Sequence, residues 1–310
     1  MRPKLSINHS EVYGENSTLG LSYLIKTLIN SGLFEIEEHN EKLSVMRGER
    51  ATIVYYNGKK VYVDFWEYTT PSHTMEAYNA EFDLIVKLQH IDLSLEQYNR
   101  YCNRKNIMKG LSDDDKSKYL SKIVPWTFFP SRMMEEFVGN EQGLQQAMHP
   151  IESSCFFCGK DWKCRHGMLK SLNEQNIECI VSDQGLRFGK KIKIESYLHK
   201  MLSSRYGLIL HGRNTALTDC KNRREIDYMI MHKPLLLNYK PFYYDHLIEG
   251  THYIYIDEKT KIDSFSDMYN TEEIEHNAYE WYKRNATPMG AANTFLHIMR
   301  EKFNEQGDTL

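Results

Sequence analysis

The sequence predicts an α/β protein made of two Rossmann-like domains that face a central cleft. Short apolar runs alternate with helical segments between residues 205 and 257, a pattern typical of βαβ units around a parallel sheet. The chain has 310 residues, which exceeds the usual size of one domain, so two domains of about 150 residues each are expected. We therefore place an acceptor-side domain at 1–150 and a nucleotide-binding domain at 151–310, whose amphipathic C-terminal helix, expected at 291–303, would cross back to the first domain.

The strongest βαβ pattern supplies a predicted ligand site. Strands are expected at residues 208–210, 234–237 and 253–256. A helix is expected from about Arg223, after a loop at Gly212. Ligands of parallel sheets bind at the carboxyl ends of the strands, beside helix N-termini. A cationic helix start facing a glycine loop suits a diphosphate, and this indicates a nucleotide-type donor.

The start of the second domain offers further phosphate ligands. Residues 154–160 predict a strand and a glycine turn, and Lys163 and Arg165 stand at the start of the next helix. Backbone amides at a helix start, together with Lys160 or Arg165, can hold a diphosphate leaving group without a metal ion. The predicted donor-binding residues are Gly159, Lys160, Arg165, Gly212, Arg213, Arg223, Arg224 and Glu225. Beyond this helix we expect a strand at 177–181 and a helix at 195–202.

Residues 155–257 carry a resemblance to known glycosyltransferases. The order is Phe-Phe-x-Gly, Tyr followed by Gly six residues later, an arginine-bearing helix, a Leu-Leu-Leu strand and His-Tyr-Ile. It resembles the C-terminal half of the protein O-glucosyltransferase (capsule-associated type) and exostosin-like families. The resemblance implies a GT-B fold, a nucleotide-sugar donor and an inverting reaction. Where those families have Phe-Arg-Gly this chain has Phe-Cys158-Gly, so one cation is missing or replaced.

The first domain contains a predicted β-hairpin that leads to two candidate catalytic carboxylates. Asn57-Gly58 suits a type I′ turn between strands at 51–56 and 59–66, which is unusual for a purely parallel Rossmann half. Asp64 and Glu67 follow at the exit of the second strand, where a rigid base beside a loop can accept a proton. The resemblance implies Glu67 as the acceptor-activating base, and a shift of three residues gives Asp64. Alternatively both are ordinary strand-end carboxylates on the solvent side.

Other segments of the first domain are predicted to contact the acceptor or to pack. The helix opening at residues 16–22 is capped by Ser17 or Thr18, or its first turn contacts an acceptor or phosphate. A strand is expected at 81–88, a helix from Ser94 to about 109, and an exposed turn at 113–118. The basic residues of the helix from Ser94 are either acceptor-binding or one solvated face. They are Arg100, Arg104, Lys105 and Lys109.

The composition of the chain bears on its cellular location and on whether it contacts DNA or a membrane. The net charge of −3 leaves no overall nucleic-acid footprint, so any contact with DNA has to come from a local patch. No run of about 18 apolar residues exists, and the N-terminal residues lack a signal-peptide core. We expect a cytoplasmic monomer with no membrane contact, unlike the secretory members of the resembled families. A short chain rich in Asn, Lys and Tyr is also typical of phage proteins, which would place it in the host cytoplasm.

The cysteines and the missing nucleotide-binding motifs bear on whether the protein uses a metal ion or a cofactor. Cys155, Cys158, Cys164 and His166 have the ligand types for a structural zinc, although the spacing is short for a knuckle and free thiols are the simpler expectation. Neither a Gly-x-Gly-x-x-Gly nor a Walker motif is present. No Asp-x-Asp follows a strand to chelate a metal-bound nucleotide. We therefore expect no cofactor and a metal-independent reaction, with the nucleotide sugar as co-substrate.

The predicted function is transfer of a sugar from a nucleotide-diphosphate donor, expected to be a UDP-sugar, to a hydroxyl group. The leading acceptor is a 5-hydroxymethylpyrimidine base in phage duplex DNA, which would be flipped out of the helix to react. The alternative enzyme acts on a glycan or on protein serine or threonine. A different class is a non-catalytic, zinc-containing nucleic-acid-binding protein.

Overall fold

The computed structural model divides the chain into two compact units. Unit 1 comprises Met1–Phe129, Phe242–Tyr244 and Arg284–Leu310, and unit 2 comprises Pro130–Pro241 and Asp245–Lys283. The structure describes residues 2–8, 26–40, 51–64, 82–88, 94–99, 111–127, 150–160, 163–182, 194–211 and 223–303. Both units combine strands with helices, which confirms the predicted α/β class. In these ranges no helix has the length and apolar character needed to cross a membrane.

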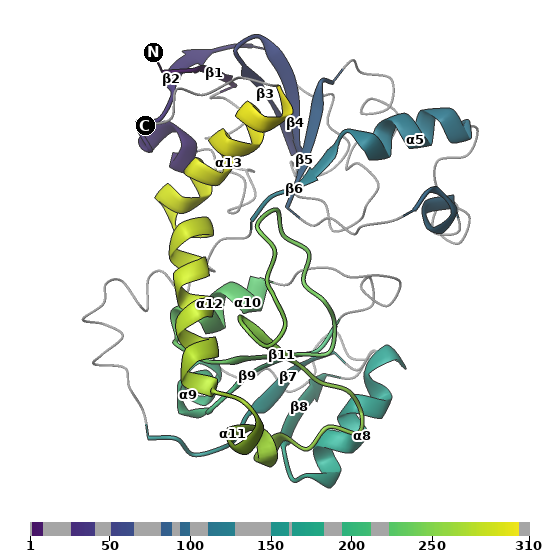
Figure 1. The fold of residues 1–310 in the computed structure, drawn as a ribbon, viewed down its shortest axis with the longest axis vertical. Helices are drawn as coiled ribbons and strands as arrows, with labels where there is room; N and C mark the ends of the chain where they lie inside the picture. Colours follow the sequence, from purple (N-terminus) through teal and green to yellow (C-terminus); the bar gives the residue numbers. More distant parts are fainter. Residues whose placement is uncertain are drawn as a thin grey trace. The chain divides into compact units, whose positions relative to one another are not determined.

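Unit 1 is built on a mixed sheet with the strand order β2-β1-β3-β4-β5-β6 (Figure 1). The strands are β1 (Lys4–Ile7), β2 (Glu35–Glu38), β3 (Ala51–Tyr56), β4 (Lys59–Asp64), β5 (Leu84–Lys87) and β6 (Ile123–Pro125). β3 is antiparallel to both of its neighbours, while β1–β2 and β4–β5–β6 pair in parallel. Among the described strands of unit 1, only β3 runs against the others, as the predicted hairpin requires.

The β3–β4 hairpin confirms the prediction made from Asn-Gly. Asn57 and Gly58 have φ values of 46° and 79°, the left-handed region that both central residues of a type I′ turn occupy. The hairpin also fixes the register in which Ala51 pairs with Asp64. As a result, Asp64 stands at the carboxyl end of β4.

Helix α13 (Pro288–Lys302) packs on one face of the unit 1 sheet. The Trp126 Nε1–H donates to the Ala291 carbonyl oxygen at 3.1 Å, and the Trp126 and Phe295 ring centroids are 4.9 Å apart. The helix begins before the predicted residue 291 because Thr287 caps it: the Thr287 hydroxyl accepts from the backbone N–H of Gly290 at 3.1 Å. The first turn of α13 is thus held beside the carboxyl end of β6.

Residues 113–121 form a helix where the sequence analysis expected a turn. In α5 (Asp113–Ser121) the Ser112 hydroxyl accepts from the backbone N–H of Asp115 at 3.1 Å. Three aspartates in the first turn add a favourable interaction with the helix dipole. Residues 95–99 are helical as expected after Ser94, and Tyr98 stacks on Tyr119 of α5 with ring centroids 6.2 Å apart.

Unit 2 contains five strands that all run parallel within its described residues. They are β7 (Phe156–Lys160), β8 (Glu178–Ser182), β9 (Gly207–Ile209), β10 (Leu235–Leu237) and β11 (Tyr253–Tyr255). β7 pairs with β8, and β9, β10 and β11 form a second ladder. A parallel bridge between Ser153 and Ser204 joins the two, and Tyr206 N–H donates to the Ser154 carbonyl at 2.9 Å. The combined order is β8-β7-β9-β10-β11.

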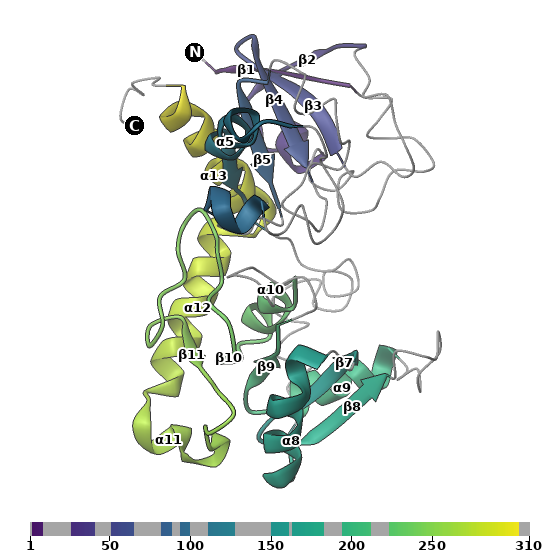
Figure 2. The same ribbon diagram turned by 90° about the vertical axis from the view of Figure 1, so that its right-hand side faces the viewer.

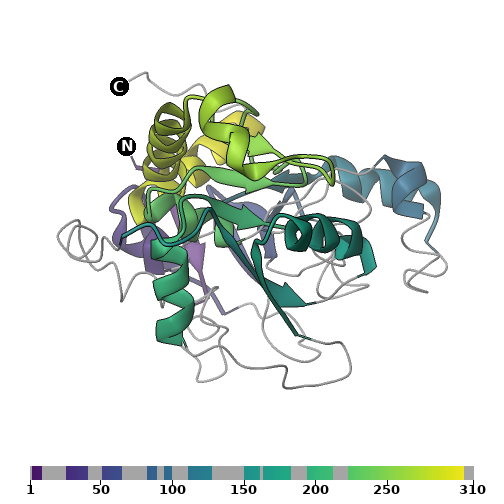
Figure 3. The same ribbon diagram turned by 90° about the horizontal axis from the view of Figure 1, so that it is seen from below.

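Helices cover both faces of this parallel sheet (Figures 2 and 3). They are α8 (His166–Glu174), α9 (Ile194–Ser203), α10 (Arg223–Ile230), α11 (Phe265–Met268) and α12 (Thr271–Asn285), with 3-10 turns at Lys163–Arg165 and Ile262–Ser264. Leu208, Leu236 and Ile254 share one face through the strand register and belong to a core with residues of α8, α11 and α12. Phe156 packs on Tyr197 of α9, and Gly207 on Tyr228 of α10, on the other face. Unit 2 is therefore a doubly wound α/β unit.

Candidate functional site

The strand order of unit 2 reverses between β7 and β9. In doubly wound sheets with this order, ligands bind in the crevice outside the carboxyl ends of the two strands where the order reverses. Here those ends are Cys158 to Lys160 of β7 and residues 210–211 after β9. Helix α10 begins at Arg223, after residues 212–222. Of the predicted donor-binding residues that the structure describes, Gly159, Arg165 and Arg224 lie at this topological switch point of unit 2.

Arg165 is one of two arginines that bind backbone at this point. Its side chain is buried, Nη2 donates to the Leu210 carbonyl at 2.9 Å, and Nε donates to the His211 carbonyl at 2.5 Å. The guanidinium also lies over the Phe157 ring, 5.2 Å from its centroid. Arg165 was expected to meet the diphosphate, whereas these contacts hold the end of β9.

Arg224 is the second arginine. It lies on α10 and contacts β7, whereas Arg165 contacts the residues after β9. Nη1 donates to the Cys158 carbonyl of β7 at 2.5 Å, and the guanidinium lies 6.0 Å from the Tyr197 ring centroid. Arg224 is half-buried, so part of its charge remains accessible. Its neighbour Glu225 is fully buried and accepts a hydrogen bond from the Tyr239 hydroxyl. Arg224 is therefore the better placed of the two to meet a ligand.

Gly159 lies inside β7 and not in a turn, which corrects the sequence interpretation. A Cβ at this position would stand 2.7 Å from Phe157 Cζ and 3.2 Å from Arg165 Nη1. The missing side chain thus makes room for the packing of Arg165 on Phe157. For the remaining predicted donor ligands, Gly212 and Arg213 lie outside the described residues, as do the side chains of Lys160 and Arg223.

His211 and Asn238 form a close pair at the ends of β9 and β10, and neither was predicted as a site residue. The backbone N–H of His211 donates to Asn238 Oδ1 at 2.7 Å, and Asn238 Nδ2 lies 2.7 Å from His211 Nδ1. Because the amide nitrogen donates, Nδ1 accepts and the proton of the neutral ring sits on Nε2. Burial lowers the pKa of His211, and Arg165 lowers it further, against the Asn238 hydrogen bond. The sequence pattern that could have indicated this pair is a polar residue directly after an apolar strand, His211 after 208–210 and Asn238 after 235–237.

In unit 1, a row of buried polar residues follows the carboxyl ends of the parallel strands. Asn8 follows β1, Asp64 ends β4, Lys87 ends β5 and Thr127 follows β6. Lys87 Nζ lies 2.9 Å from Asp64 Oδ2, and both side chains are fully buried. Burial lowers the pKa of Lys87, and the Asp64 carboxylate opposes that shift. Only Asp64 was predicted, because the three other residues become neighbours through strand pairing.

The remaining predicted acceptor residues cannot be placed beside this row. Glu67 lies outside the described residues, and so do Arg100, Arg104, Lys105 and Lys109 of the basic helix. Their roles as base and as acceptor-binding surface stay predictions.

The candidate zinc ligands do not gather into a site. All four of them are described, and no group of three or more His, Cys, Asp or Glu side chains able to hold a metal occurs among the described residues. Cys155 is buried, and burial raises the pKa of its thiol well above the ordinary range. Burial also raises the pKa values of Cys158 and Cys164.

Comparisons with known proteins give only distant likenesses. No family model matches the chain, and no curated protein matches it. A solved glycosyltransferase from Rickettsia africae ESF-5 is similar with a TM-score of 0.39 and 12% identity, over 77% of this chain and 69% of that one. The wall teichoic acid polymerase TagF, as its H548A variant, is similar with a TM-score of 0.31 and 10% identity, over 98% and 89% of the two chains. Scores at this level do not establish a shared fold, so the class of protein has to follow from this chain's own residues.

Proposed function

We propose that this protein is a glycosyltransferase that takes a sugar from a nucleoside diphosphate, a UDP-sugar, and passes it to a hydroxyl group. The observation that carries the proposal is the β7–β9 switch point of unit 2, where a half-buried Arg224 and a neutral His211 stand at the strand ends. A parallel sheet binds nucleotides at this position, and cations and N–H donors there offset the charge that develops on a departing diphosphate. The resemblance over residues 155–257 supports a sugar as the transferred group.

The donor site is proposed to act without a metal ion. Arg224 and the backbone amides at the start of α10 would hold the diphosphate, with Arg223, Lys160 and Arg213 adding charge. The resembled families imply a GT-B arrangement and inversion at the anomeric carbon. Turnover should then survive EDTA, and a loss of activity that magnesium or manganese restores would contradict this part of the proposal.

The catalytic base is proposed to come from the exit of β4 in unit 1. Asp64 stands there, but Lys87 already occupies one of its oxygens at 2.9 Å. Glu67 follows three residues later in the chain and is the residue that the family resemblance implies. Replacing the base by its amide should remove most turnover and leave donor affinity unchanged, because the base acts on the acceptor. Asp64→Asn and Glu67→Gln should be compared in this way.

The acceptor is proposed to be a 5-hydroxymethylpyrimidine in duplex DNA, with a glycan or a protein serine or threonine as the alternative. Arg100, Arg104, Lys105 and Lys109 would meet the phosphates, and binding would weaken steeply with salt. The deciding assay offers duplexes with cytosine, hydroxymethylcytosine or hydroxymethyluracil, together with a panel of nucleotide sugars, and reads the products by mass spectrometry. Transfer to peptides or free sugars but to no duplex would sink the DNA proposal and leave the donor proposal intact.

Calorimetry of nucleotide-sugar binding tests the donor site directly. Loss of a charge-assisted phosphate contact costs about 1.5–3 kcal/mol, so alanine at Arg223 and Arg224 should weaken binding by roughly tenfold or more. Arg284→Ala is the matched control, because Arg284 is exposed and lies on α12. Unchanged affinity in the double variant would place the nucleotide elsewhere.

A further inference from the structure

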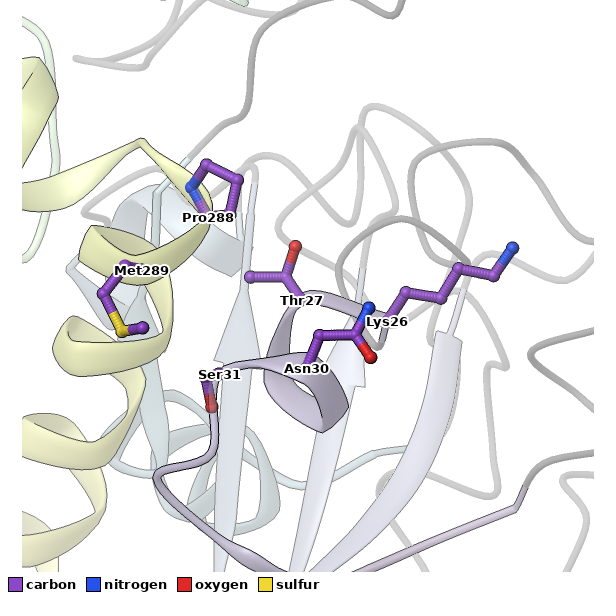
Figure 4. A pocket seen from close by; sticks show the side chains of 6 residues that line it. All are labelled: Lys26, Thr27, Asn30, Ser31, Pro288 and Met289. Carbon is purple, nitrogen blue, oxygen red and sulfur yellow. The ribbon is translucent and has the colours of Figure 1, made fainter.

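Unit 1 contains a pocket that none of the roles above uses. It lies between helical residues 26–30 and the first turn of α13, and its volume is ≈ 370 Å³ (Figure 4). The lining residues are Lys26, Thr27, Asn30, Ser31, Pro288 and Met289. This volume falls within the range of small-molecule sites, which starts at about 300 Å³. None of the lining residues belongs to the candidate donor site of unit 2.

A buried hydroxyl in this pocket has no hydrogen-bond partner. Thr27 is only 7% exposed, and its hydroxyl has no partner among the residues that the structure describes. In Figure 4 the hydroxyl points away from its own helix. Thr294 of α13 is buried to a similar degree, but its hydroxyl bonds to the Gly290 carbonyl at 3.0 Å and to Asn285 Oδ1 at 3.2 Å. Because an unsatisfied buried hydroxyl is costly, the Thr27 hydroxyl points to a missing polar partner.

Three other polar side chains line the pocket: Lys26, Asn30 and Ser31, whose hydroxyl donates to the Leu28 carbonyl at 2.8 Å. Asn30 is exposed, and its amide can both donate and accept. At the start of α13 the Thr287 hydroxyl accepts a hydrogen bond from the N–H of Gly290, and Pro288 has no backbone N–H that could donate. The Met289 N–H has no hydrogen-bond partner within the described part of the chain. The pocket therefore presents a short polar edge that is able to donate and to accept.

One side of the pocket is apolar, whereas Lys26, Thr27, Asn30 and Ser31 line the other, and this limits the kind of ligand. Pro288 and Met289 form one side, and Met289 is unusual in being 48% exposed for a large apolar residue. No carboxylate is among the lining residues. A sugar carries hydroxyls around its whole rim, whereas a planar heterocycle has two apolar faces and hydrogen-bonding groups along its edge.

We propose that this pocket binds a planar heterocyclic ring of nucleobase size. Thr27 and Asn30 contact the polar edge of the ring, and Pro288 and Met289 pack against its face. Apolar side chains against a base together with hydrogen bonds to its edge are the means by which proteins hold an unstacked base. An asparagine amide suits such an edge, because it donates and accepts side by side. The site stands independently of the donor chemistry proposed for unit 2.

The test is a ligand-observed NMR titration with the four common nucleosides, alongside methyl glucoside and inorganic phosphate. A nucleoside could also enter the proposed donor site, so every titration is repeated with Arg224→Ala. At least one nucleoside should bind in both backgrounds. Thr27→Val, which keeps the shape and removes the hydroxyl, should weaken that binding about tenfold in both, as expected for one lost hydrogen bond to a ligand.

Matched variants separate binding from folding. Thr27→Val removes an unpaired hydroxyl, so its melting temperature should equal or exceed that of the wild type, whereas Thr294→Val should melt lower and still bind. The proposal is overturned if no nucleoside binds, if only methyl glucoside or phosphate binds, or if Thr27→Val binds nucleosides as tightly as the wild type. Failure of the donor proposal would appear separately, as nucleotide-sugar affinity that does not respond to the arginine variants.

Discussion

Lys87 and Asp64 form a fully buried ion pair, 2.9 Å from Nζ to Oδ2, at the carboxyl ends of the adjacent parallel strands β5 and β4. The strand register places the two residues directly opposite each other. Two charges removed from water are tolerated only while each has the other as partner. The pair therefore ties the candidate catalytic carboxylate to the stability of the unit 1 sheet.

Removing one partner of this pair should destabilise the protein strongly. Asp64→Asn or Lys87→Met alone should each lower the free energy of unfolding by about 3–5 kcal/mol, while the double variant Asp64→Leu/Lys87→Met should recover much of that loss. Urea denaturation followed by circular dichroism measures the effect. Lys59→Ala is the control, since its 3.9 Å pair with Asp83 is exposed and contributes less than about 1 kcal/mol. Should Asp64→Asn keep full stability and lose turnover, Asp64 would be the base and not a structural residue.

The sequence predicted the local elements well because local patterns determine them. The apolar runs that became β9, β10 and β11 and the Asn57-Gly58 hairpin are all short-range signals. Helix α5 was not predicted because its residues are almost all polar, so that the Ser112 cap is the main local signal for its start. The Asp64–Lys87 and His211–Asn238 pairs join residues 23 and 27 positions apart. Such pairs depend on strand order and register, which no local pattern reports.

Arg165 is predicted to contribute to stability more than to donor affinity. Arg165→Met would leave the carbonyls of Leu210 and His211 without their charged donor, and hydrogen bonds to charged groups are worth about 1.5–3 kcal/mol each. We expect a loss of that order in thermal or urea unfolding. The exposed neighbour Lys163 supplies the control, because Lys163→Ala should change stability by less than about 0.5 kcal/mol. A stable Arg165→Met protein that cannot bind a nucleotide sugar would restore the direct diphosphate role.

A side chain at Gly159 should disturb the switch point from within β7. Gly159→Ala would place a Cβ 2.7 Å from Phe157 Cζ, and overpacking of this kind costs about 1–3 kcal/mol. Because Arg165 Nη1 is the next nearest atom, at 3.2 Å, the strain should be smaller in an Arg165→Met background. A double-mutant cycle in urea measures this coupling. Strictly additive effects would show that Gly159 and Arg165 act independently.

His211 is predicted to make stability depend on pH in the mildly acidic range. Burial lowers the pKa of His211 in the folded protein, while the unfolded chain keeps a value of about 6.5. Between the lowered value and 6.5 the unfolded state binds more protons, so stability rises with pH through this window. The contribution is present above about pH 6.5 and is lost as the pH falls through the folded-state pKa.

Urea unfolding at about pH 7.5 and at about pH 5 checks this, with His211→Gln compared with the wild type. The variant should lose less stability than the wild type on acidification, because it has no imidazole to protonate. His276→Gln is the control, since His276 is an exposed residue of α12 and should leave the wild-type pH dependence unchanged. If the wild type and His211→Gln lost the same stability, His211 would be as free to protonate in the folded protein as in the unfolded chain. Such a result would contradict the lowered pKa of His211 in the folded protein.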